Sequence, residues 1–290
     1  MGIEQLTYLD TTNFNPNPII VSEDFKNKVQ TAIDRLRHFE PPEGYYGCFS
    51  GGKDSQCIYE LSKMAKVKVD WHYNVTGLDY PELVRFIRRY YPEVKFERRE
   101  KSFWKALIYN GYPTRKIRWC CREYKEHSGD GRFKIIGIRW AESVQRKGRS
   151  MVEVCNKKNG GKFLSPIIDW TGEINKKGRK VGDVWDFIKA RNLPYCSMYD
   201  EGWDRLGCIL CPMKSYEKSM IDYERYPEFA KLWRKAFNSL YIARKESFNP
   251  EKDEECSVDK WVSGDEMFEW WLTRKGFEDE DSAQQCFMFE

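Results

Sequence analysis

Six consecutive residues constrain the fold of this chain more than any other feature: Ser50-Gly51-Gly52-Lys53-Asp54-Ser55. A short apolar run at 45–49 precedes them, and an amphipathic stretch at 54–66 follows. This context predicts a buried strand, a glycine-rich loop and a helix, in that order. Unpaired N–H groups at a helix N-terminus bind anions, and glycines let the backbone approach a phosphate closely. The string therefore predicts a phosphate-binding loop.

The side chains of this loop add detail to the prediction. Lys53 supplies a positive charge, and Ser50 and Ser55 supply hydroxyl donors. Asp54 is unusual in an anion site, and suits a carboxylate that holds Mg²⁺ or caps the helix. Neither GxxxxGK[ST] nor GxGxxG is present, so two common nucleotide-binding motifs are excluded. The alternative is a plain glycine turn between a strand and a helix.

Strands alternate with helices along most of the chain. The hydrophobic pattern predicts strands at 45–49, 67–75, 94–98, 133–138 and 163–168, and helices at 22–39, 54–66, 80–91, 102–110 and 181–191. This alternation predicts an α/β fold, with an open parallel twisted sheet and helices on both faces. Residues 125–132, 156–162 and 171–179 are expected to form loops or insertions. The last of these is either a solvated loop or a flexible hairpin or lid.

After Pro212 the pattern becomes helical, with helices expected at 223–245 and 264–274. We therefore predict three parts: an N-terminal helical segment (1–40), an α/β domain (41–215) and a helical C-terminal segment (216–290). Four tryptophans of the last part either form a helical core or present a surface to a partner: Trp233, Trp261, Trp270 and Trp271.

Composition excludes several classes of protein. The net charge of +4 permits phosphate-bearing ligands but does not demand a nucleic acid. No run of about 18 apolar residues is present, so no membrane span is expected. The first residues lack the basic-then-apolar pattern of a secretory signal. We expect a cytoplasmic protein without a membrane partner.

The cysteines form two pairs that are far apart in the sequence. Ten cysteines without a secretory signal favour thiols or metal ligation over disulfides. Cys120 and Cys121 are adjacent, and Cys208 and Cys211 form a CxxC. Two such pairs can enclose either zinc or an iron–sulfur cluster. Cys155 is a spare that can replace one of the adjacent pair, and Lys125 lies either near this site or in solvent.

Several segments resemble a known family. The SGGKDS string resembles the pyrophosphate-binding motif of the adenine nucleotide α-hydrolase superfamily, which includes ATP pyrophosphatases and phosphoadenosine phosphosulfate (PAPS) reductases. The turn at 75–82, the segment 137–146, and 166–170 with 183–185 resemble elements of the PAPS reductase branch, in the expected order. The resemblance covers roughly residues 25–215. It implies that the adenine nucleotide is bound by Ser50, Gly51, Gly52, Lys53, Asp54, Ser55, Thr76, Gly77, Glu82 and Arg139.

Two arginines also fit an anion site on general grounds. Arg139 and Arg146 follow the predicted strand at 133–138, and ligands of open α/β sheets bind beyond the carboxyl ends of the strands. The guanidinium fork matches the oxygens of phosphate or sulfate. The resemblance implies catalytic roles for Asp54, Arg139 and Arg146. The alternative is that the arginines pair with Glu142 at the surface.

The cysteine pairs resemble the four-iron–four-sulfur site of adenylyl sulfate (APS) reductases and of sulfur-insertion proteins in DNA phosphorothioation systems. The resemblance implies a cluster held by Cys120, Cys121, Cys208 and Cys211, with zinc or unligated thiols as alternatives. It fails at the nucleophile, because the C-terminal ECG-x-H motif of the reductases is absent. Cys256 and Cys286 are the remaining candidates. His38, His72 and His127 are expected to be structural or at the surface.

The leading expectation is a PAPS-reductase-like enzyme that binds ATP or an adenylyl sulfate, with Mg²⁺ if the ligand is ATP. It would make or break a linkage at the α-phosphate in support of sulfur transfer. One alternative is a thiol-dependent reductase of APS or PAPS that forms sulfite. Another is a nucleotide-binding regulatory or defence-system subunit without turnover. The corresponding partners are a thiol or sulfur-donor protein and a DNA-modification or defence protein; no oligomeric state is predicted.

Overall fold

The computed structural model describes residues 22–126, 128–154, 161–175, 178–250 and 255–273. These residues form two compact units, each assembled from several chain segments. Unit 1 draws on Met1–Asn74, Pro81–Glu97 and Ser128–Leu206, and unit 2 on Val75–Tyr80, Arg98–His127 and Gly207–Glu290. The sequential division at residues 40 and 215 stays a prediction.

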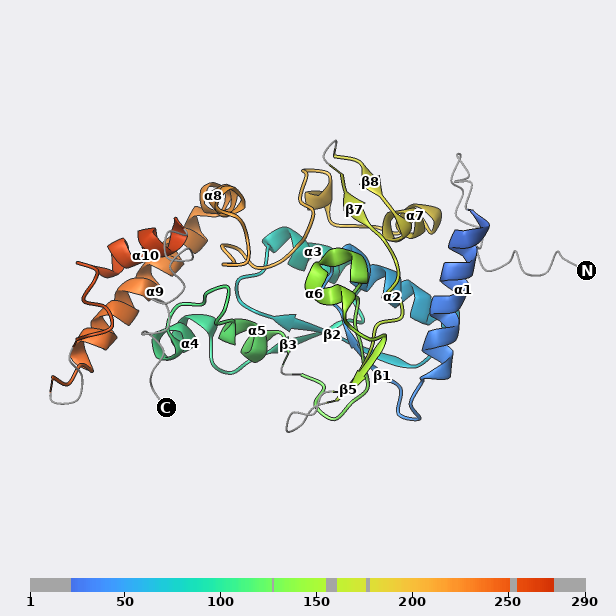
Figure 1. Ribbon diagram of the computed structural model, residues 1–290, viewed down its shortest axis with the longest axis horizontal. Helices are drawn as coiled ribbons and strands as arrows, with labels where there is room; N and C mark the ends of the chain where they lie inside the picture. The colour runs from blue at the N-terminus through green and yellow to red at the C-terminus, as the bar shows by residue number, and fades with distance from the viewer. Residues whose placement is uncertain (1–21, 127, 155–160, 176–177, 251–254, 274–290) are drawn as a thin grey trace, which may run out of the picture. The chain divides into compact units, whose positions relative to one another are not determined.

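Unit 1 is built on a six-stranded sheet with the strand order β3-β2-β1-β4-β6-β5 (Figure 1). The strands are β1 (Tyr45–Cys48), β2 (Val69–Val75), β3 (Lys95–Arg98), β4 (Lys134–Ile135), β5 (Val152–Val154) and β6 (Lys162–Leu164). β1 pairs in parallel with β2 and β4, and β4 pairs in parallel with β6. β5 is antiparallel to β6. The predicted α/β fold with a mainly parallel sheet is confirmed.

The strand order reverses at β1, and this reversal positions the candidate site. The chain proceeds from β1 to β2 and β3 on one side, whereas β4 pairs with the other side of β1. In open α/β sheets, ligands bind at such a point, outside the carboxyl ends of the strands. The residues that follow β1 and those that follow β4 are therefore brought to the same edge.

In its described residues, unit 1 has five α-helices: α1 (Glu23–His38), α2 (Lys53–Ala65), α3 (Pro81–Tyr90), α6 (Val144–Lys147) and α7 (Asp183–Ala190). α2 packs against both α1 and α7, so these three helices lie side by side (Figure 1). The Ser22 hydroxyl caps α1 by accepting a hydrogen bond from the Phe25 N–H at 3.2 Å. α1 then buries Phe25, Val29, Ile33 and Leu36 at helical spacing.

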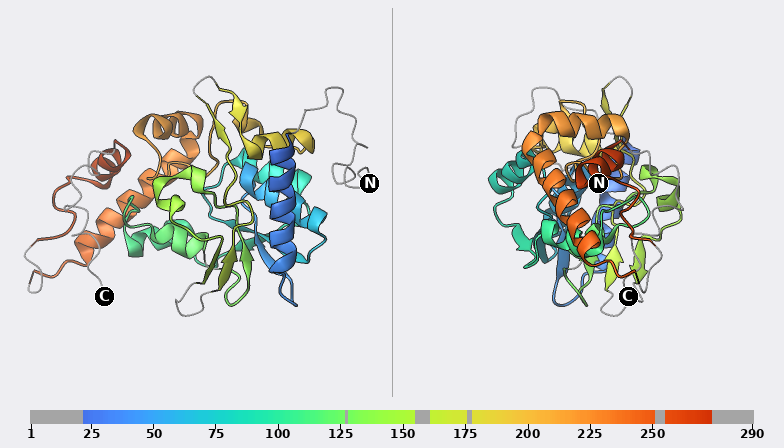
Figure 2. Two further views of the ribbon diagram at one scale, coloured as in Figure 1. Left: turned by 45° about the vertical axis from the view of Figure 1, so that its right-hand side comes forward. Right: turned by 90° about the vertical axis from the view of Figure 1, so that its left-hand side faces the viewer.

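Unit 2 is helical, with α4 (Phe103–Asn110), α5 (Trp119–Tyr124), α8 (Tyr216–Arg225), α9 (Pro227–Glu246) and α10 (Gly264–Leu272). The long helix α9 packs against α4, α8 and α10 (Figure 2). The Trp233 ring stacks on Trp271, with 4.6 Å between centroids, and meets Phe103 edge-on at 5.1 Å. Trp233, Trp261 and Trp271 are buried and Trp270 is half-buried. These tryptophans therefore build a core rather than a surface for a partner.

Several predicted boundaries are wrong. The strand expected at 133–138 is shorter in the structure, where β4 has only two residues, because Gly137 already lies against the first turn of α2. A Cβ added at Gly137 would stand 3.0 Å from Asp54 Cβ. The strand expected at 163–168 is β6. The helix expected at 223–245 is divided between α8 and α9, because Pro227 lacks the N–H that would continue α8 and instead begins α9.

One predicted insertion contains the hairpin that the sequence offered as an alternative to a solvated loop. Within the expected loop at 171–179 and just after it, β7 (Glu173–Ile174) and β8 (Lys180–Val181) form an antiparallel hairpin, whose residues 176–177 lie outside the described part. Most of the expected loop at 156–162 also lies outside the described residues. In the described part of the chain, no helix is long and apolar enough to cross a membrane.

Candidate functional site

The glycine loop lies between β1 and α2, where the sequence predicted it. Gly51 has a φ of +71°, and a Cβ at this position would stand 2.7 Å from side-chain atoms of Leu83 and Ile87 on α3. Both the left-handed backbone and the close packing therefore require glycine. Gly52 is the N-cap of α2 and offers no side chain to the helix N-terminus. The first N–H groups of α2 are thus left to other partners.

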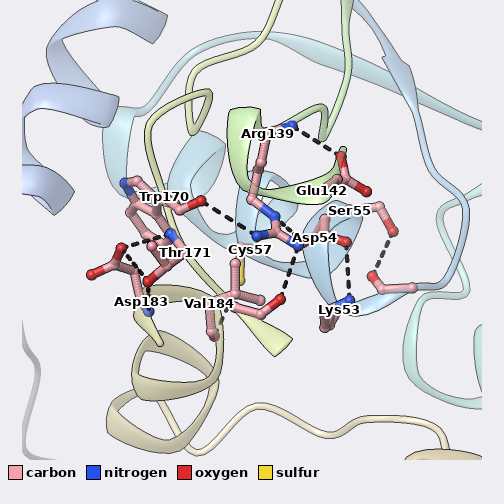
Figure 3. A network of polar contacts seen from close by, with 12 residues as sticks. Lys53, Asp54, Ser55, Cys57, Arg139, Glu142, Trp170, Thr171, Asp183 and Val184 are labelled. Atoms are coloured by element: carbon pink, nitrogen blue, oxygen red, sulfur yellow. Dashed lines mark hydrogen bonds and ion pairs between the residues drawn. The ribbon is translucent and has the colours of Figure 1, made fainter. Parts of the chain in front are cut away.

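Two serine hydroxyls hold the loop closed on itself. Ser50 Oγ lies 3.2 Å from Ser55 Oγ, and it accepts the Gly52 N–H at 3.4 Å. Ser55 Oγ also donates to the Gly52 carbonyl at 2.8 Å. Each hydroxyl retains acceptor or donor capacity beyond these bonds, which lets it contact a bound anion. Figure 3 shows Ser55 beside Asp54 at the start of α2.

Arg139 is buried at this loop, and it is only 2% exposed. Its Nε donates to Asp54 Oδ1 at 2.6 Å, and its other nitrogens donate to the carbonyls of Trp170 at 3.3 Å and Gly172 at 3.1 Å (Figure 3). The guanidinium group is therefore engaged by three acceptors from two segments, the first turn of α2 and residues 170–172. In this arrangement Arg139 orients Asp54 and joins the segment after β4 to α2.

Glu142 links the two predicted arginines. It accepts the Arg139 N–H at 3.0 Å, and it forms an ion pair with Arg146. Arg146 is half-buried, at the end of the short helix α6. Of the two side chains, that of Arg146 pairs with Glu142, as the alternative expected, whereas that of Arg139 is buried and pairs with Asp54. Their catalytic roles stay a prediction.

Lys53 is buried as well, and its ammonium group lies among oxygens of unit 1. Its Nζ is 3.5 Å from Asp54 Oδ2 and 3.4 Å from the Asp204 carbonyl. Both carboxylate oxygens of Asp54 therefore face a cation, Arg139 on one side and Lys53 on the other. A divalent ion on the same oxygens would lie against two positive side chains, which opposes its binding. This arrangement of Asp54 does not fit the predicted Mg²⁺.

Tyr199 is a site residue that the sequence analysis missed. Its hydroxyl accepts the Lys53 N–H at 3.0 Å, and the side chain is buried. Burial raises the pKa of Tyr199, and the nearby Asp54 carboxylate raises it further, so the hydroxyl keeps its proton at neutral pH. No motif marks this tyrosine, because only the fold brings it to the N-terminus of α2 from a position 146 residues away along the chain.

The predicted turn residues divide between the two units. Thr76 and Gly77 belong to unit 2, and Glu82 lies in the first turn of α3 in unit 1. Thr76 donates from its N–H to Asp79 Oδ2 at 2.8 Å and from its hydroxyl to Asp79 Oδ1 at 2.9 Å. Gly77 has a φ of +80°, which the turn requires.

Both cysteine pairs lie in unit 2. Cys120 and Cys121 are on α5, and Cys208 forms an antiparallel bridge with Asp79. Cys208 Sγ also lies 3.7 Å from Thr76 Oγ1. The hydrogen bond with Cys121 raises the pKa of Cys120, and so does burial. The charges on Cys121, Cys208 and Cys211 raise it further. All four cysteines that the sequence singled out therefore belong to unit 2.

The electrostatics of the two pairs differ. The hydrogen bond with Cys120 lowers the pKa of Cys121 to about 6, and Lys125 and Arg118 favour its thiolate further. Burial raises the pKa of Cys208. Charge interaction with Cys208 and then Cys211 raises the pKa of Lys125, so this lysine lies near the cysteines. Lys125 thus supplies a positive charge near the thiols.

Four thiols in one unit are the donor set that iron–sulfur clusters take, so the chemistry of the residues fits such a group. As they stand among the described residues, however, no group of three or more His, Cys, Asp or Glu side chains is arranged to hold a metal ion. Cys155, the predicted spare, lies outside the described residues. The iron–sulfur cluster stays a prediction, and so does its alternative, zinc.

The other predicted residues are accounted for as follows. Cys256 is buried, and its Sγ lies 3.5 Å from the Arg244 carbonyl, so its thiol is not presented to a substrate. His72 is buried, stacks on Tyr46 and lies 2.7 Å from Glu97 Oε1, in keeping with a structural role. His38 is exposed at the end of α1. Cys286 and His127 lie outside the described residues.

Comparison with known proteins identifies the family. Residues 45–214, more than half of the chain, match the model of the phosphoadenosine phosphosulfate reductase domain. Adenosine 5'-phosphosulfate reductase of Staphylococcus epidermidis is 25% identical over 238 residues, which cover 76% of this chain and 90% of that enzyme.

Two archaeal relatives are longer than this chain. The uncharacterized proteins MJ0973 and MJ0066 of Methanocaldococcus jannaschii are 28% and 30% identical to it over 195 and 206 residues. These matches cover 64% and 66% of this chain but 45% and 40% of the relatives, so the chain spans less than half of their length. The segment 45–214, which matches the family model, contains the SGGKDS loop, Arg139 and all four paired cysteines. The chain belongs to the phosphoadenosine phosphosulfate reductase domain family.

Proposed function

We propose that this chain is an adenine-nucleotide-binding enzyme of sulfur chemistry, which binds ATP or a related adenylyl compound and makes or breaks a linkage at its α-phosphate. The observation that carries this proposal is the loop at 50–55. It joins β1 to the N-terminus of α2 at the point where the strand order reverses. Helix N-H groups, two serine hydroxyls and a buried lysine meet there, and together they favour an anionic ligand.

The proposed roles follow from the contacts. Ser50, Ser55 and the loop N–H groups hold the pyrophosphate or sulfate end of the ligand. Asp54 and Arg139 hold each other in place, so that the first turn of α2 is fixed before the ligand binds. Arg146, which is half-buried and pairs with Glu142, is the residue we propose to stabilise charge that develops at the phosphorus or sulfur.

Nucleotide binding and turnover test this proposal directly. We expect the purified protein to bind ATP or adenylyl sulfate, and to release AMP from the ligand that it uses. Asp54→Ala should abolish turnover, because it frees Arg139 and Lys53 from their shared partner. Asp34→Ala is the matched control, since Asp34 is exposed on α1 of the same unit. Absence of binding to every adenine nucleotide tested would refute the proposal.

We also propose that Cys120, Cys121, Cys208 and Cys211 hold a four-iron–four-sulfur cluster. When bound, such a cluster supplies a redox-active group ligated by thiolates. Placement of all four thiols in unit 2 supports this choice of ligands. Iron and acid-labile sulfide, with a broad visible absorption, are expected in protein purified without oxygen. Zinc as the bound metal, with no iron, would contradict the cluster.

A second candidate is a thiol-dependent reductase of adenylyl sulfate or phosphoadenylyl sulfate. The match to an adenosine 5'-phosphosulfate reductase across 90% of that enzyme favours it. The burial of Cys256 weighs against that residue as the nucleophile. Incubation with either substrate and a thiol should form sulfite if this candidate is correct. Sulfite formation that persists in both Cys256→Ser and Cys286→Ser would exclude these two cysteines as the nucleophile.

The partners belong to the proposal as well. An enzyme of this kind needs a source of sulfur or of reducing thiol, so a thiol or a sulfur-donor protein is the partner we expect. A DNA-modification or defence protein is the partner if the chain binds nucleotide without turnover. Release of AMP by the chain alone would argue against the second possibility.

A further inference from the structure

A buried carboxylate outside the family-matched segment reaches the CxxC loop. Asp222 lies on α8, beyond residue 214, and its side chain is 0% exposed. It accepts hydrogen bonds from the Leu210 N–H at 2.7 Å and from the Tyr80 hydroxyl at 2.8 Å, and it forms an ion pair with Lys214. Three partners in unit 2 therefore meet on one carboxylate.

The first of these contacts holds the backbone between the two cysteines of the CxxC. Leu210 has a φ of +56°, a left-handed conformation that a leucine adopts only when its surroundings enforce it. The bond from its N–H to Asp222 is one such constraint. On the other side of the loop, the Ile209 N–H donates to the Leu78 carbonyl at 2.8 Å. The loop is thus held between α8 and the turn at 76–80.

The second contact ties the same carboxylate to that turn. Tyr80 closes the turn that begins with Thr76, and its buried hydroxyl donates to Asp222. Thr76 in turn lies beside Cys208. Asp222 is therefore bonded both to the CxxC loop and to the turn that faces it, and its loss would loosen both at once.

The third contact concerns charge. The Lys214 ammonium lies over the Tyr80 ring, 4.6 Å from the centroid, and it contacts the Tyr80 hydroxyl as well as Asp222. A mostly buried ammonium needs a counter-charge, and Asp222 supplies it. Lys214 is also close enough to Cys208 and Cys211 for their charges to act on it. The ion pair with Asp222 therefore neutralises the charge of Lys214 near the thiols.

We propose that Asp222 is a positioning residue of the cysteine site, which fixes the CxxC loop against the turn at 76–80 and neutralises Lys214 beside the thiols. The helical C-terminal segment thereby contributes to a site whose cysteines all lie in the family-matched segment. The inference rests on the cysteine site of the proposed function.

Three variants test it: Asp222→Asn, which keeps the shape but removes the charge; Tyr80→Phe, which removes one bond and keeps the ion pair; and Asp259→Asn as the matched control. Asp259 is a half-exposed residue of unit 2 that pairs with Lys245. The first readout is the alkylation rate of each cysteine in reduced, cluster-free protein. Asp222→Asn should speed alkylation of Cys208 and Cys211 about fivefold or more, because the loop opens more often.

The buried cysteines of unit 1, Cys57 and Cys196, separate this local effect from general unfolding. They should react at the wild-type rate in all three variants. The second readout is the reduction potential of the iron-loaded protein. Loss of a negative charge beside the thiols should make the potential of Asp222→Asn more positive, whereas Asp259→Asn should leave it unchanged.

Folded Asp222→Asn protein with wild-type alkylation rates at Cys208 and Cys211 would overturn the inference. If that variant does not fold, Tyr80→Phe decides by the same readout, and unchanged rates there count against the inference. A wild-type protein that binds no iron would refute the cluster. It would leave the alkylation test intact, since that test needs no metal.

Discussion

The hydroxyl of Tyr199 accepts a hydrogen bond from the Lys53 N–H, the first N–H group of α2, at the loop proposed to bind the nucleotide. Among the described residues its own proton has no acceptor, so the proton is available to a ligand oxygen. Tyr199→Phe should lower the free energy of unfolding by about 1 kcal/mol, because the Lys53 N–H loses its partner. It should also weaken nucleotide binding about five- to tenfold, which calorimetric titration measures.

Tyr90→Phe is the matched control, because Tyr90 is an exposed tyrosine of the same unit. It should change neither quantity. A Tyr199→Phe protein that is less stable but binds nucleotide with wild-type affinity would leave Tyr199 with the role of a helix cap alone.

Cys121 gives a pH-dependent prediction. Its pKa of about 6, lowered first by Cys120 and then by Lys125 and Arg118, means that its thiolate is the main form at neutral pH. In reduced, cluster-free protein, its alkylation rate should therefore rise with pH and reach half its maximum near pH 6. Cys208, whose pKa burial raises, should react far more slowly at that pH. Mass spectrometry of the alkylated peptides distinguishes the two sites.

Lys125→Ala should move the midpoint for Cys121 to higher pH, because a cation that favours the thiolate is lost. Lys235→Ala, at an exposed position of α9 in the same unit, should not. A midpoint for Cys121 near the ordinary thiol value of about 8.5 in the wild-type protein would contradict the prediction.

At the level of residues, the sequence predicted the loop but not its partners. Ser50, Gly51, Gly52 and Ser55 are found in the predicted strand–loop–helix context, because local sequence determines that context. The engagement of Asp54 by Arg139 was not predicted, since 85 residues separate the two and no local pattern encodes the pairing. Tyr199 and Asp222 were missed for the same reason.

Among the elements, the packing of β1 against β2 requires a glycine at position 47. A Cβ at Gly47 would stand 2.2 Å from the indole of Trp71 on β2, and a buried ring has little room to move. Gly47→Ala should therefore lower the free energy of unfolding by about 1–3 kcal/mol. The change is measured by denaturant unfolding, and β1 carries the loop, so nucleotide affinity should fall as well.

Gly148→Ala provides the comparison. This glycine follows α6, has a φ of −84°, and has nothing within 4 Å of an added Cβ. Its replacement should leave stability within about 0.5 kcal/mol of the wild type. Equal stability of the two variants would show that the sheet tolerates a shift of Trp71, contrary to our expectation.

The long periodic elements were predicted from sequence, whereas the short ones were not. α1, α2 and α3 lie within two residues of their predicted bounds, because each has an apolar face at helical spacing. α5 has six residues, too few to show a period, and it carries Cys120 and Cys121. The division between α8 and α9 depends on Pro227, a local signal that the continuous apolar pattern concealed.

For the whole molecule, the chain passes between the two units five times, at 74/75, 80/81, 97/98, 127/128 and 206/207. Patterns along the sequence predict domains made of one continuous segment each. They could not predict a unit in which residues 75–80 and 98–127 belong with residues 207–290. Residues 98–127 belong with 207–290, and aromatic contacts such as Phe103 on Trp233 and Tyr112 on Phe237 join the two segments. That packing is a property of the folded chain and leaves no local pattern.

This interleaving predicts the outcome of truncation after residue 206. The shortened chain retains every segment of unit 1 but loses α8, α9 and α10. Phe103 then loses Trp233, Tyr112 loses the stacked ring of Phe237, and the Pro113 carbonyl loses the Trp271 indole N–H. The truncated protein should expose aromatic surface, bind the dye ANS strongly and melt at lower temperature.

A chain that ends at residue 273 is the control, because it keeps every contact described for α4 through α10. The 1–206 chain should melt at a lower temperature than this 1–273 reference. Nucleotide binding by the 1–206 chain is the informative measurement, since the loop at 50–55, Arg139 and Tyr199 all lie in unit 1. If unit 1 folds alone, its affinity should remain while the cysteine site is lost, because Cys208, Cys211 and Asp222 are gone. If the truncated chain binds no ANS and melts like the full-length protein, the residues at 98–127 do not depend on the C-terminal helices, and the division into two interleaved units is wrong.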